Sequence, residues 1–205
     1  RPRPGARTRR CLRPRRSPRS RRGRRSPQAA RRAGRRRRET DASTPGFFRA
    51  MMRDFPGLEQ LDMVECPGTR DDRANLKVGR MIREAGLVTH VPAIGSVRSG
   101  AVELFFAGVE RDIARGAEFA VHSWMDVHGR EAEDFAMNAP ENRQYLDYYR
   151  EMGMSSDQAR AFYEFTNSVP HRRALWLDAS DMQSLAVLAM LGVLIAFAVG
   201  PGCIA

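Results

Sequence analysis

Lysine is almost absent from this chain of 205 residues, which contains Lys77 beside 34 arginines. Acidic side chains are absent from residues 1–38, although that segment holds 19 arginines. Residues 39–205 hold 16 basic and 24 acidic side chains, so the formal net charge of +11 comes from the first segment alone. The sequence therefore predicts a strongly basic tail followed by an acidic domain.

Large apolar side chains are also missing from the tail, where Leu12 is the one large aliphatic residue. We expect residues 1–41 to be disordered, because they bury too little surface to offset chain entropy. An arginine-rich arm can bind nucleic acid through counterion release. The alternative interpretation is a start codon assigned too early. An arginine-rich, lysine-poor composition is typical of a GC-rich genome, where translation of sequence upstream of the true start gives a segment of this kind. No apolar run follows the arginines, so neither a secretory nor a twin-arginine signal is expected.

Cysteine is scarce as well. The three cysteines lie far apart and offer neither metal-ligand spacing nor a disulfide framework. The four histidines form no zinc signature, so we expect no metal and no cofactor. The residues concerned are Cys11, Cys66, Cys203, His90, His122, His128 and His171.

Charge is absent from residues 184–205, which include a strongly apolar run over 185–199. This run is shorter than the roughly 20 residues that a helix needs to cross a bilayer. We expect a helix over 183–199 within an apolar C-terminal segment, 183–205. A buried helix and a membrane anchor both remain open. Cys203 lies one place too late for prenylation.

Between these ends, the hydrophobic pattern alternates between short strands and helices. Helices are predicted over residues 44–55, 70–86, 99–110, 140–152 and 156–167, and another is predicted after Asp178. Strands are predicted over residues 58–66, 87–92, 117–122 and 173–177. This alternation is typical of an α/β domain with a largely parallel sheet, here over residues 42–182.

Ser99 and His122 stand at the ends of neighbouring predicted elements. Ser99 begins a helix after a turn at Gly95, and His122 ends the next strand. A helix start offers free backbone N–H groups, and a histidine can act as a base, so the pair has the parts of an acyl-transfer site. A helix-capping serine and a surface histidine would produce the same pattern without any catalytic role.

Three motifs surround this pair in a fixed order. Cys66-Pro67-Gly68-Thr69 follows a strand at the place of a Ser-Pro-Gly-Gly turn, and three residues separate Gly95 from Ser99-Gly100. A helix of small residues runs on to Gly108, and His122 closes the next strand. With this order and spacing, residues 60–124 resemble the proteolytic subunit of Clp protease, within the Clp/crotonase superfamily. In detail they are similar to small periplasmic Clp-like proteins of bacteria.

The resemblance implies a spiral of strand-strand-helix units and a serine hydrolase mechanism. Ser99 would be the nucleophile, His122 the base, and the amides of Gly68 and Gly100 the oxyanion hole. It also implies a peptide or acyl substrate, a homo-oligomer, and a periplasmic or membrane-associated location. A membrane contact through residues 183–199 would rest instead on the apolar run itself.

The aspartate that completes the site in this family has no counterpart here. Pro170-His171-Arg172-Arg173 stands at its place, and Asp178 and Asp181 are explained as a helix cap and a first-turn acid. An aspartate at position 172 or 173 is expected to supply the missing group. The predicted function is a Clp-like serine hydrolase of peptidase type that lacks a clear third catalytic acid. The alternatives are an inactive binding or assembly module with the same fold and a crotonase-type acyl-thioester enzyme.

Overall fold

The structure, a computed structural model, describes residues 39–191, with side chains as far as residue 185. The chain divides into two units, Arg1–Arg36 and Arg37–Ala205, and the described residues lie in the second. The predicted disorder of the basic tail and the outer part of the predicted helix over 183–199 therefore lie outside the described residues.

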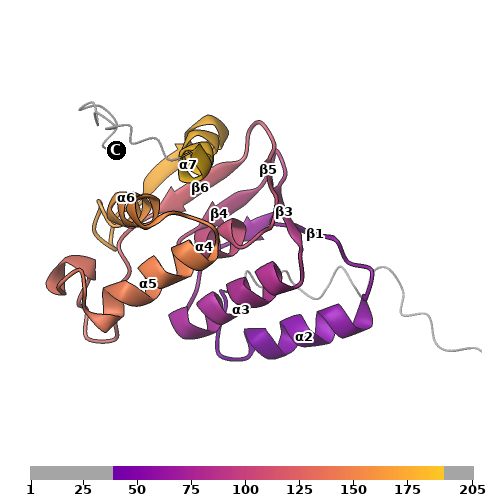
Figure 1. The fold of residues 1–205 in the computed structure, drawn as a ribbon, viewed down its shortest axis with the longest axis horizontal. Helices are drawn as coiled ribbons and strands as arrows, with labels where there is room; N and C mark the ends of the chain where they lie inside the picture. The colour runs from indigo at the N-terminus through magenta and orange to yellow at the C-terminus, as the bar shows by residue number, and fades with distance from the viewer. Residues whose placement is uncertain (1–38, 192–205) are drawn as a thin grey trace, which may run out of the picture. The chain divides into compact units, whose positions relative to one another are not determined.

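The described residues form seven strands and six α-helices (Figure 1). The strands are β1 (Gln60–Asp62), β2 (Glu65–Cys66), β3 (Val88–Val91), β4 (Ser96–Arg98), β5 (Arg111–Ile113), β6 (Glu118–Val121) and β7 (Leu175–Asp178). The helices are α2 (Thr44–Asp54), α3 (Asp72–Glu84), α4 (Ala101–Phe106), α5 (Pro140–Glu151), α6 (Ser156–Thr166) and α7 (Ala179–Leu191), with the short 3-10 helix η1 at Ala132–Asp134.

The strands belong to two sheets, with the orders β1-β3-β5 and β2-β4-β6-β7. All neighbours are parallel except β6 and β7, which are antiparallel. From β1 to β6, consecutive strands enter different sheets, and a helix follows each of the first two pairs: β1-β2-α3, then β3-β4-α4, then β5-β6 (Figure 1). The predicted α/β architecture of strand-strand-helix units is confirmed.

Three predicted elements differ in detail. The single strand predicted over 58–66 is two strands, because the chain changes sheets at Met63-Val64: the Met63 amide bonds to the His90 carbonyl, whereas the Val64 carbonyl accepts from Ser96. Strand β4 occupies the end of the predicted turn. The helix predicted over 99–110 is the six-residue α4, and strand β5 follows it.

Helix α4 lies in the hydrophobic core and packs against α3 and against strands of both sheets. Its Phe105 and Phe106 are fully buried. Their rings meet Phe119 and Phe162 edge-on or tilted, at centroid distances of 5.3 and 4.6 Å. A helix that is apolar on nearly every side is stable only inside a core, and this burial fixes the position of α4 and of the residues that flank it.

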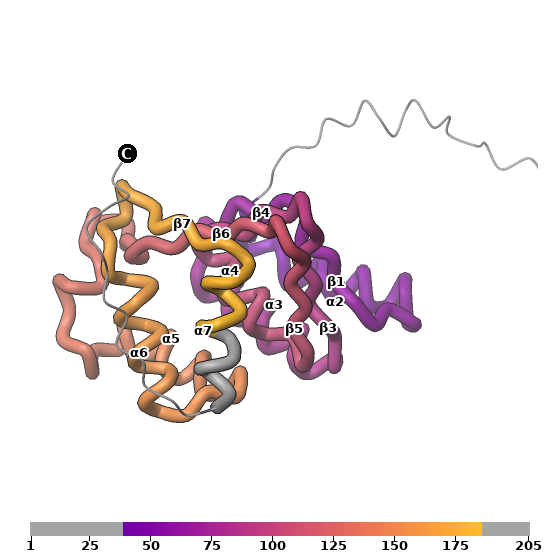
Figure 2. The backbone as a smooth tube through the Cα atoms, turned by 90° about the horizontal axis from the view of Figure 1, so that it is seen from above, coloured from indigo at the N-terminus to yellow at the C-terminus, as the bar shows by residue number. Residues whose placement is uncertain are grey.

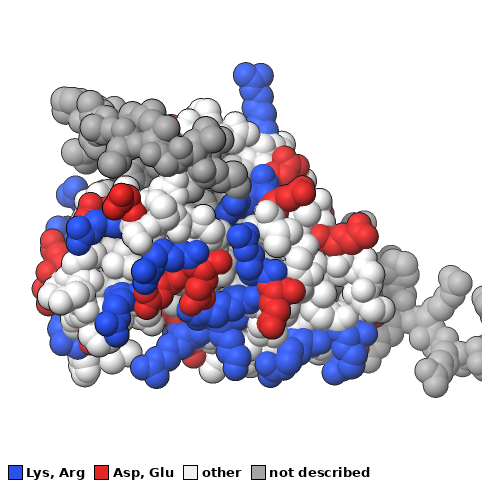
Figure 3. Space-filling model, in the orientation of Figure 1, with Lys and Arg blue, Asp and Glu red and all other residues white. Residues whose placement is uncertain are grey.

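Helices α2, α3 and α5 cover one face of the domain. Figure 3 shows basic and acidic side chains interspersed over this face. An ion pair between Arg80 of α3 and Glu151 of α5 links two of these helices. Exposed pairs of this kind contribute at most about 1 kcal/mol, so the helices are held mainly by their apolar sides.

The predicted helix ends are confirmed where the side chains are described. Ser155 and Gln158 form a reciprocal capping box at the start of α6, and Gly86 has φ +68° after α3. The Asp178 carboxylate accepts from the amides of Ser180 and Asp181 at the start of α7.

Helix α7 lies between α6 and β5, and the Gln183 amide group donates to the Ile113 carbonyl of β5 at 3.3 Å (Figure 2). In the described part of the chain, α7 included, no helix reaches the length and hydropathy of a membrane span.

Thr40 joins the start of the described chain to the turn that follows β2. Its amide donates to the Gly68 carbonyl at 2.9 Å, and its carbonyl accepts from the Arg70 amide at 2.8 Å. These two bonds form a parallel bridge between Thr40 and Thr69. Glu39 pairs with Arg70 in addition, so contacts with the domain begin ahead of position 42, the predicted start of the domain.

Candidate active site

Ser99 lies at the bend between β4 and α4, with a backbone φ of +50°. Among residues 39–191 it is the one residue other than glycine that has a left-handed backbone. Its amide donates to the Ala120 carbonyl at 2.8 Å, and its carbonyl accepts from the Val102 amide at 2.8 Å. The left-handed conformation costs a non-glycine residue about 1–2 kcal/mol, and such strain is concentrated at functional sites. Helix α4 itself begins two residues later, at Ala101.

Gly68 and Gly100 bring two backbone turns against Ser99. Gly68 has φ +122°, and a Cβ atom built on it would lie 2.9 Å from the Ser99 Cβ. A Cβ atom on Gly100 would lie 2.4 Å from the Thr69 Cγ2. Glycine is therefore required at both positions by close approach. Within the described residues neither amide N–H donates a hydrogen bond, so both can receive an oxygen atom of a ligand.

Asn75 of α3 is a part of this region that the sequence pattern did not single out. Its side-chain amide donates to the Gly100 carbonyl at 2.6 Å, and its Oδ1 accepts from the Thr40 hydroxyl at 2.8 Å. The side chain is buried, so these bonds are shielded from water. Asn75 thereby fixes the turn at Gly100 against the start of the described chain. We call Gly68, Ser99 and Gly100 the serine side of the site.

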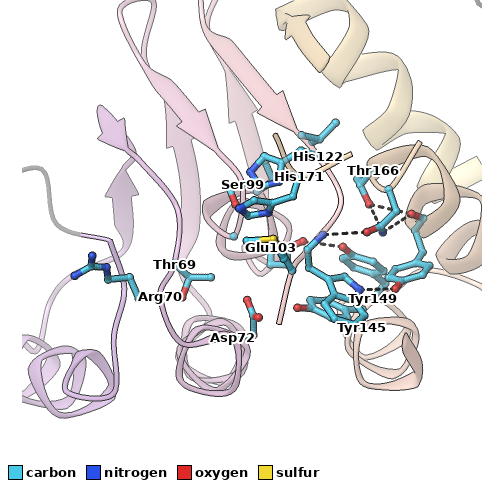
Figure 4. A pocket seen from close by; sticks show the side chains of 17 residues that line it. Thr69, Arg70, Asp72, Ser99, Glu103, His122, Tyr145, Tyr149, Thr166 and His171 are labelled. Carbon is cyan, nitrogen blue, oxygen red and sulfur yellow. Dashed lines mark hydrogen bonds between the residues drawn. The ribbon is translucent and has the colours of Figure 1, made fainter. Parts of the chain in front are cut away.

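His122 directly follows β6 and lies half-buried. Its Nδ1 is 2.9 Å from the Ser123 carbonyl oxygen. A carbonyl oxygen only accepts hydrogen bonds, so the neutral ring carries its proton on Nδ1 and leaves Nε2 as an acceptor. Both His122 and Ser99 line the same cavity (Figure 4). No hydrogen bond joins their side chains within residues 39–191; in unliganded sites such bonds are often long.

His171 contacts the ring of His122. It belongs to the segment in which the sequence offered no third catalytic acid. The two rings are perpendicular, with centroids 4.6 Å apart. The Nδ1 of His171 lies 3.0 Å from the Ser123 carbonyl, which therefore accepts from both imidazoles. Arg172 and Arg173, where the sequence led us to expect an aspartate to supply the missing group, are exposed. We call His122, Ser123 and His171 the histidine side of the site.

Ser123 and His171 are held by the surrounding loops. The Ser123 amide donates to the Val169 carbonyl at 2.9 Å, and its hydroxyl accepts from the Ala132 amide at 3.2 Å. The His171 amide donates to the Glu131 carboxylate at 2.8 Å. The carbonyl that orients both rings is thus fixed by long-range contacts, which a local sequence pattern does not reveal.

The cavity beside Ser99 has a volume of about 250 Å³. Its floor holds Glu103, four residues after Ser99 and on the helix that follows it. Glu103 is 8% exposed, and its Oε1 accepts from the Tyr149 hydroxyl at 2.8 Å. Its Oε2 is buried and has no hydrogen-bond partner in the described structure. Burial raises the pKa of Glu103 to about 7, so the carboxyl group is close to half-ionised at neutral pH.

Asp72 and Tyr145 lie beside this floor (Figure 4). Burial raises the pKa of Asp72, and the nearby Tyr145 hydroxyl lowers it in part. That hydroxyl is buried and makes no hydrogen bond of normal length. Burial also raises the pKa of Tyr145 and Tyr149 well above the usual tyrosine range, so both hydroxyls stay protonated. The floor is therefore rich in oxygen atoms.

Trp124 forms an aromatic wall of the cavity. Its indole N–H donates to the Tyr163 hydroxyl at 2.7 Å, and that hydroxyl donates to the Asn142 side chain. Asn142 in turn donates to the carbonyls of Ala132, Phe135 and Ala136. Such a chain of bonds fixes the wall before any ligand arrives. Burial raises the pKa of Tyr163 to about 12.

Solved structures of Clp-type proteases have a similar fold. A point mutant of ClpP1 from Listeria monocytogenes matches with a TM-score of 0.50 and 14% sequence identity, over 73% of this chain and 84% of that one. A serine-to-alanine mutant of the 1510-N membrane-bound stomatin-specific protease matches with a TM-score of 0.49 and 14% identity, over 73% of this chain and 72% of that one.

A lysine-to-alanine mutant of 1510-N in complex with a substrate peptide matches with a TM-score of 0.48 and 14% identity, over 75% of this chain and 69% of that one. No family model and no curated protein sequence matches the chain. At 14% identity the likeness concerns the fold, and the fold of this chain is Clp-protease-like.

Proposed function

We propose that this protein is a serine hydrolase of peptidase type, with Ser99 as nucleophile and His122 as general base. The observation that carries the proposal is the left-handed Ser99, held against Gly68 and Gly100 and facing the same cavity as His122. A strained serine at a strand-to-helix bend exposes its hydroxyl, as in other serine hydrolases. Retention of both Ser99 and His122 also favours this chemistry over the crotonase type, which needs no serine.

The reaction follows from the positions of these groups. The Ser99 Oγ attacks the substrate carbonyl carbon while His122 Nε2 takes the hydroxyl proton. The amides of Gly68 and Gly100 donate to the oxyanion that forms. His122 then returns the proton to the leaving group, and water releases the acyl group by the same steps. The substrate is a peptide or another acyl compound.

The Ser123 carbonyl takes the orienting role that a carboxylate has in a complete triad. It fixes the histidine tautomer, but a neutral oxygen stabilises the imidazolium cation less than a carboxylate does. In addition, His171 shares the same acceptor. We therefore expect slow turnover. The competing function is a binding or assembly module, which the missing carboxylate favours.

A fluorophosphonate probe tests the proposal directly. The Ser99 oxygen displaces fluoride from phosphorus, so the wild type should be labelled slowly, and His122→Asn more slowly still. The labelled residue is identified by peptide mass spectrometry. A well-folded wild type that is not labelled at all would favour the binding module, and a label on another residue would show that Ser99 is not the nucleophile.

Self-association belongs to the same proposal. Strand β7 is an edge strand of its sheet, and its Trp176 is 56% exposed. An exposed aromatic side chain on a sheet edge favours contact with a second copy. Light scattering after size-exclusion chromatography should give a mass above that of one chain, and Trp176→Glu should lower it.

Two statements about location and partners stay predictions. A periplasmic or membrane-associated site rests on the family resemblance, and nucleic-acid contact rests on the composition of residues 1–38. Fractionation with an alkaline carbonate wash measures the first. A salt titration of nucleic-acid binding measures the second, because affinity through arginine-phosphate contacts falls steeply with salt.

A further inference from the structure

The floor of the cavity beside Ser99 carries two acids, and among the described residues no arginine or lysine pairs with either of them. His171, which also lines the cavity, acts on Asp72 only through its charge. Glu103 and Asp72 both line the cavity, and neither forms an ion pair in this part of the chain. Arg70 also lies at the cavity, but its guanidinium pairs with Glu39 at 2.8 Å and points away from the floor (Figure 4).

The orphaned oxygen of Glu103 makes this floor unusual. Oε2 is buried without any hydrogen bond, and the Tyr145 hydroxyl close by, although it interacts with Asp72, makes none of normal length. Buried polar atoms nearly always have a partner, because an unmade bond costs about 1–3 kcal/mol. Two such atoms at one cavity indicate a ligand group that donates hydrogen bonds to them. A purely apolar group would leave both atoms unsatisfied, and an anionic group would be repelled by the carboxylates of Glu103 and Asp72.

We propose that this cavity receives a positively charged substrate side chain, such as the ammonium group of lysine, on the acyl side of the bond that Ser99 attacks. Glu103 Oε2 and the Tyr145 hydroxyl accept its hydrogen bonds, and the Asp72 carboxylate adds attraction. The inference rests on the proposed function, since it names the substrate class of that site.

The position of Glu103 links the pocket to the reacting centre. Glu103 lies in the first turn of α4, four residues after Ser99, and the cavity wall includes Ser99 itself. A substituent next to the attacked carbonyl therefore enters this cavity. The apolar stem of a lysine passes Val102 and Val121, which also line it. A carboxylate buried without a partner is expensive, so an incoming cation is favoured there more than on an exposed surface.

Two phosphonate esters that differ in one group test the inference. Both are peptidyl diphenyl phosphonates, one with a lysine-type and one with a norleucine-type side chain. Ser99 displaces phenoxide from phosphorus in each, and the two side chains differ only by the terminal ammonium. Above pH of about 7, where Glu103 is ionised, we expect the lysine probe to label at least about tenfold faster.

Glu103→Gln is the decisive variant, because glutamine keeps an acceptor for Tyr149 and removes only the charge. The ratio of the two labelling rates should fall close to one in Glu103→Gln and fall less in Asp72→Asn. The matched control is Glu84→Gln, an exposed residue of α3, which should leave the ratio unchanged. Equal rates for the two probes in the wild type, or a faster norleucine probe, would overturn the inference.

A binding measurement separates this inference from the proposed function. Nα-acetyl-lysine amide should raise the melting temperature of the Ser99→Ala protein, and Nα-acetyl-norleucine amide should not. This stabilisation needs no nucleophile and should vanish in the Ser99→Ala, Glu103→Gln double variant. Absence of stabilisation by the lysine amide would refute the pocket even if Ser99 reacts. Binding without any fluorophosphonate labelling would support the pocket and refute the hydrolase.

Discussion

Around Ser99 the close contacts are made mainly by backbone turns at Gly68 and Gly100, which the Asn75 side chain supports, whereas around His122 they are made by two imidazole rings and one carbonyl. The serine side is dictated by short segments with glycine at fixed places. The histidine side depends on loops about 50 residues apart in sequence, as the bond from His171 to Ser123 shows. The serine side, which is built from backbone turns, should therefore tolerate few substitutions. The histidine side, which is built from side chains, can be altered by single substitutions.

The largest expected effect tests whether the serine side carries the chemistry. Ser99→Ala removes the only atom that can form the covalent bond, so fluorophosphonate labelling should be abolished. The control is Ser43→Ala, an exposed serine before α2, which should be labelled at the wild-type rate. If Ser99→Ala were labelled at the wild-type rate, Ser99 would not be the nucleophile. The serine side and the histidine side would then not form one active site.

The next effect tests the close approach of the two turns. Gly100→Ala places a Cβ atom against Thr69 and displaces the amide proposed for the oxyanion, so the labelling rate should fall about 100-fold or more. Gly57→Ala is the control, since nothing lies within 4 Å of a Cβ atom at that glycine.

Adding Thr69→Gly to Gly100→Ala removes the side chain that the new Cβ meets. Part of the lost rate should return, and circular dichroism should report the same fold in each variant. If the double variant stays as slow as the single one, the loss does not come from this contact.

A smaller effect tests the histidine side. His171→Asp brings a carboxylate toward the edge of His122, and the labelling rate should rise at least about tenfold, because a carboxylate stabilises the imidazolium better than a carbonyl. Arg172→Asp is the control. It adds an acid one residue away, but on an exposed side chain that faces solvent. Equal gains in the two variants would mean that net charge, and not contact with His122, sets the rate.

A further effect, which does not depend on catalysis, is one of stability and pH. Burial raises the pKa of Glu103 to about 7 from its usual value of 4.5, helped by the charge of Asp72 and opposed by the Tyr149 hydrogen bond. The folded protein binds the proton more tightly, so this stabilisation is present below pH 4.5 and is lost as pH rises through about 7.

Glu103→Gln does not titrate at this position. Its melting temperature should therefore rise relative to the wild type over that pH range, by an amount equivalent to at most about 3 kcal/mol. Glu84→Gln should follow the wild-type curve. Parallel melting curves for wild type and Glu103→Gln at all pH values would show that Glu103 is not protonated in the folded state.

The parts of the molecule that the sequence predicts are those that short segments determine. The helix boundaries near Asp178 and Ser155, the alternation of elements and the α/β class all follow from local patterns. The places proposed for Gly68, Ser99 and Gly100 also come from local spacing. Strands β4 and β5 have three residues each, which is too short for an alternating pattern to be recognised.

Other features arise only when the chain folds. The split of 58–66 depends on which sheet receives each half, and the contact of His171 with His122 joins segments about 50 residues apart. Glu103 did carry a local signal, since it is the one charged residue in the otherwise apolar Ala101–Phe106. That signal becomes interpretable only once the burial of α4 is known.

At position 99, the residue that would make the folded protein more stable differs from the residue that the proposed reaction needs. Glycine would adopt φ +50° without the steric penalty, so Ser99→Gly should be a more stable protein by about 1 kcal/mol and an unreactive one. Selection for thermal stability alone would therefore favour losing the hydroxyl. Any effort to stabilise this domain by sequence design should hold position 99 fixed, because an energy-ranked choice there removes the one atom on which the proposed chemistry depends.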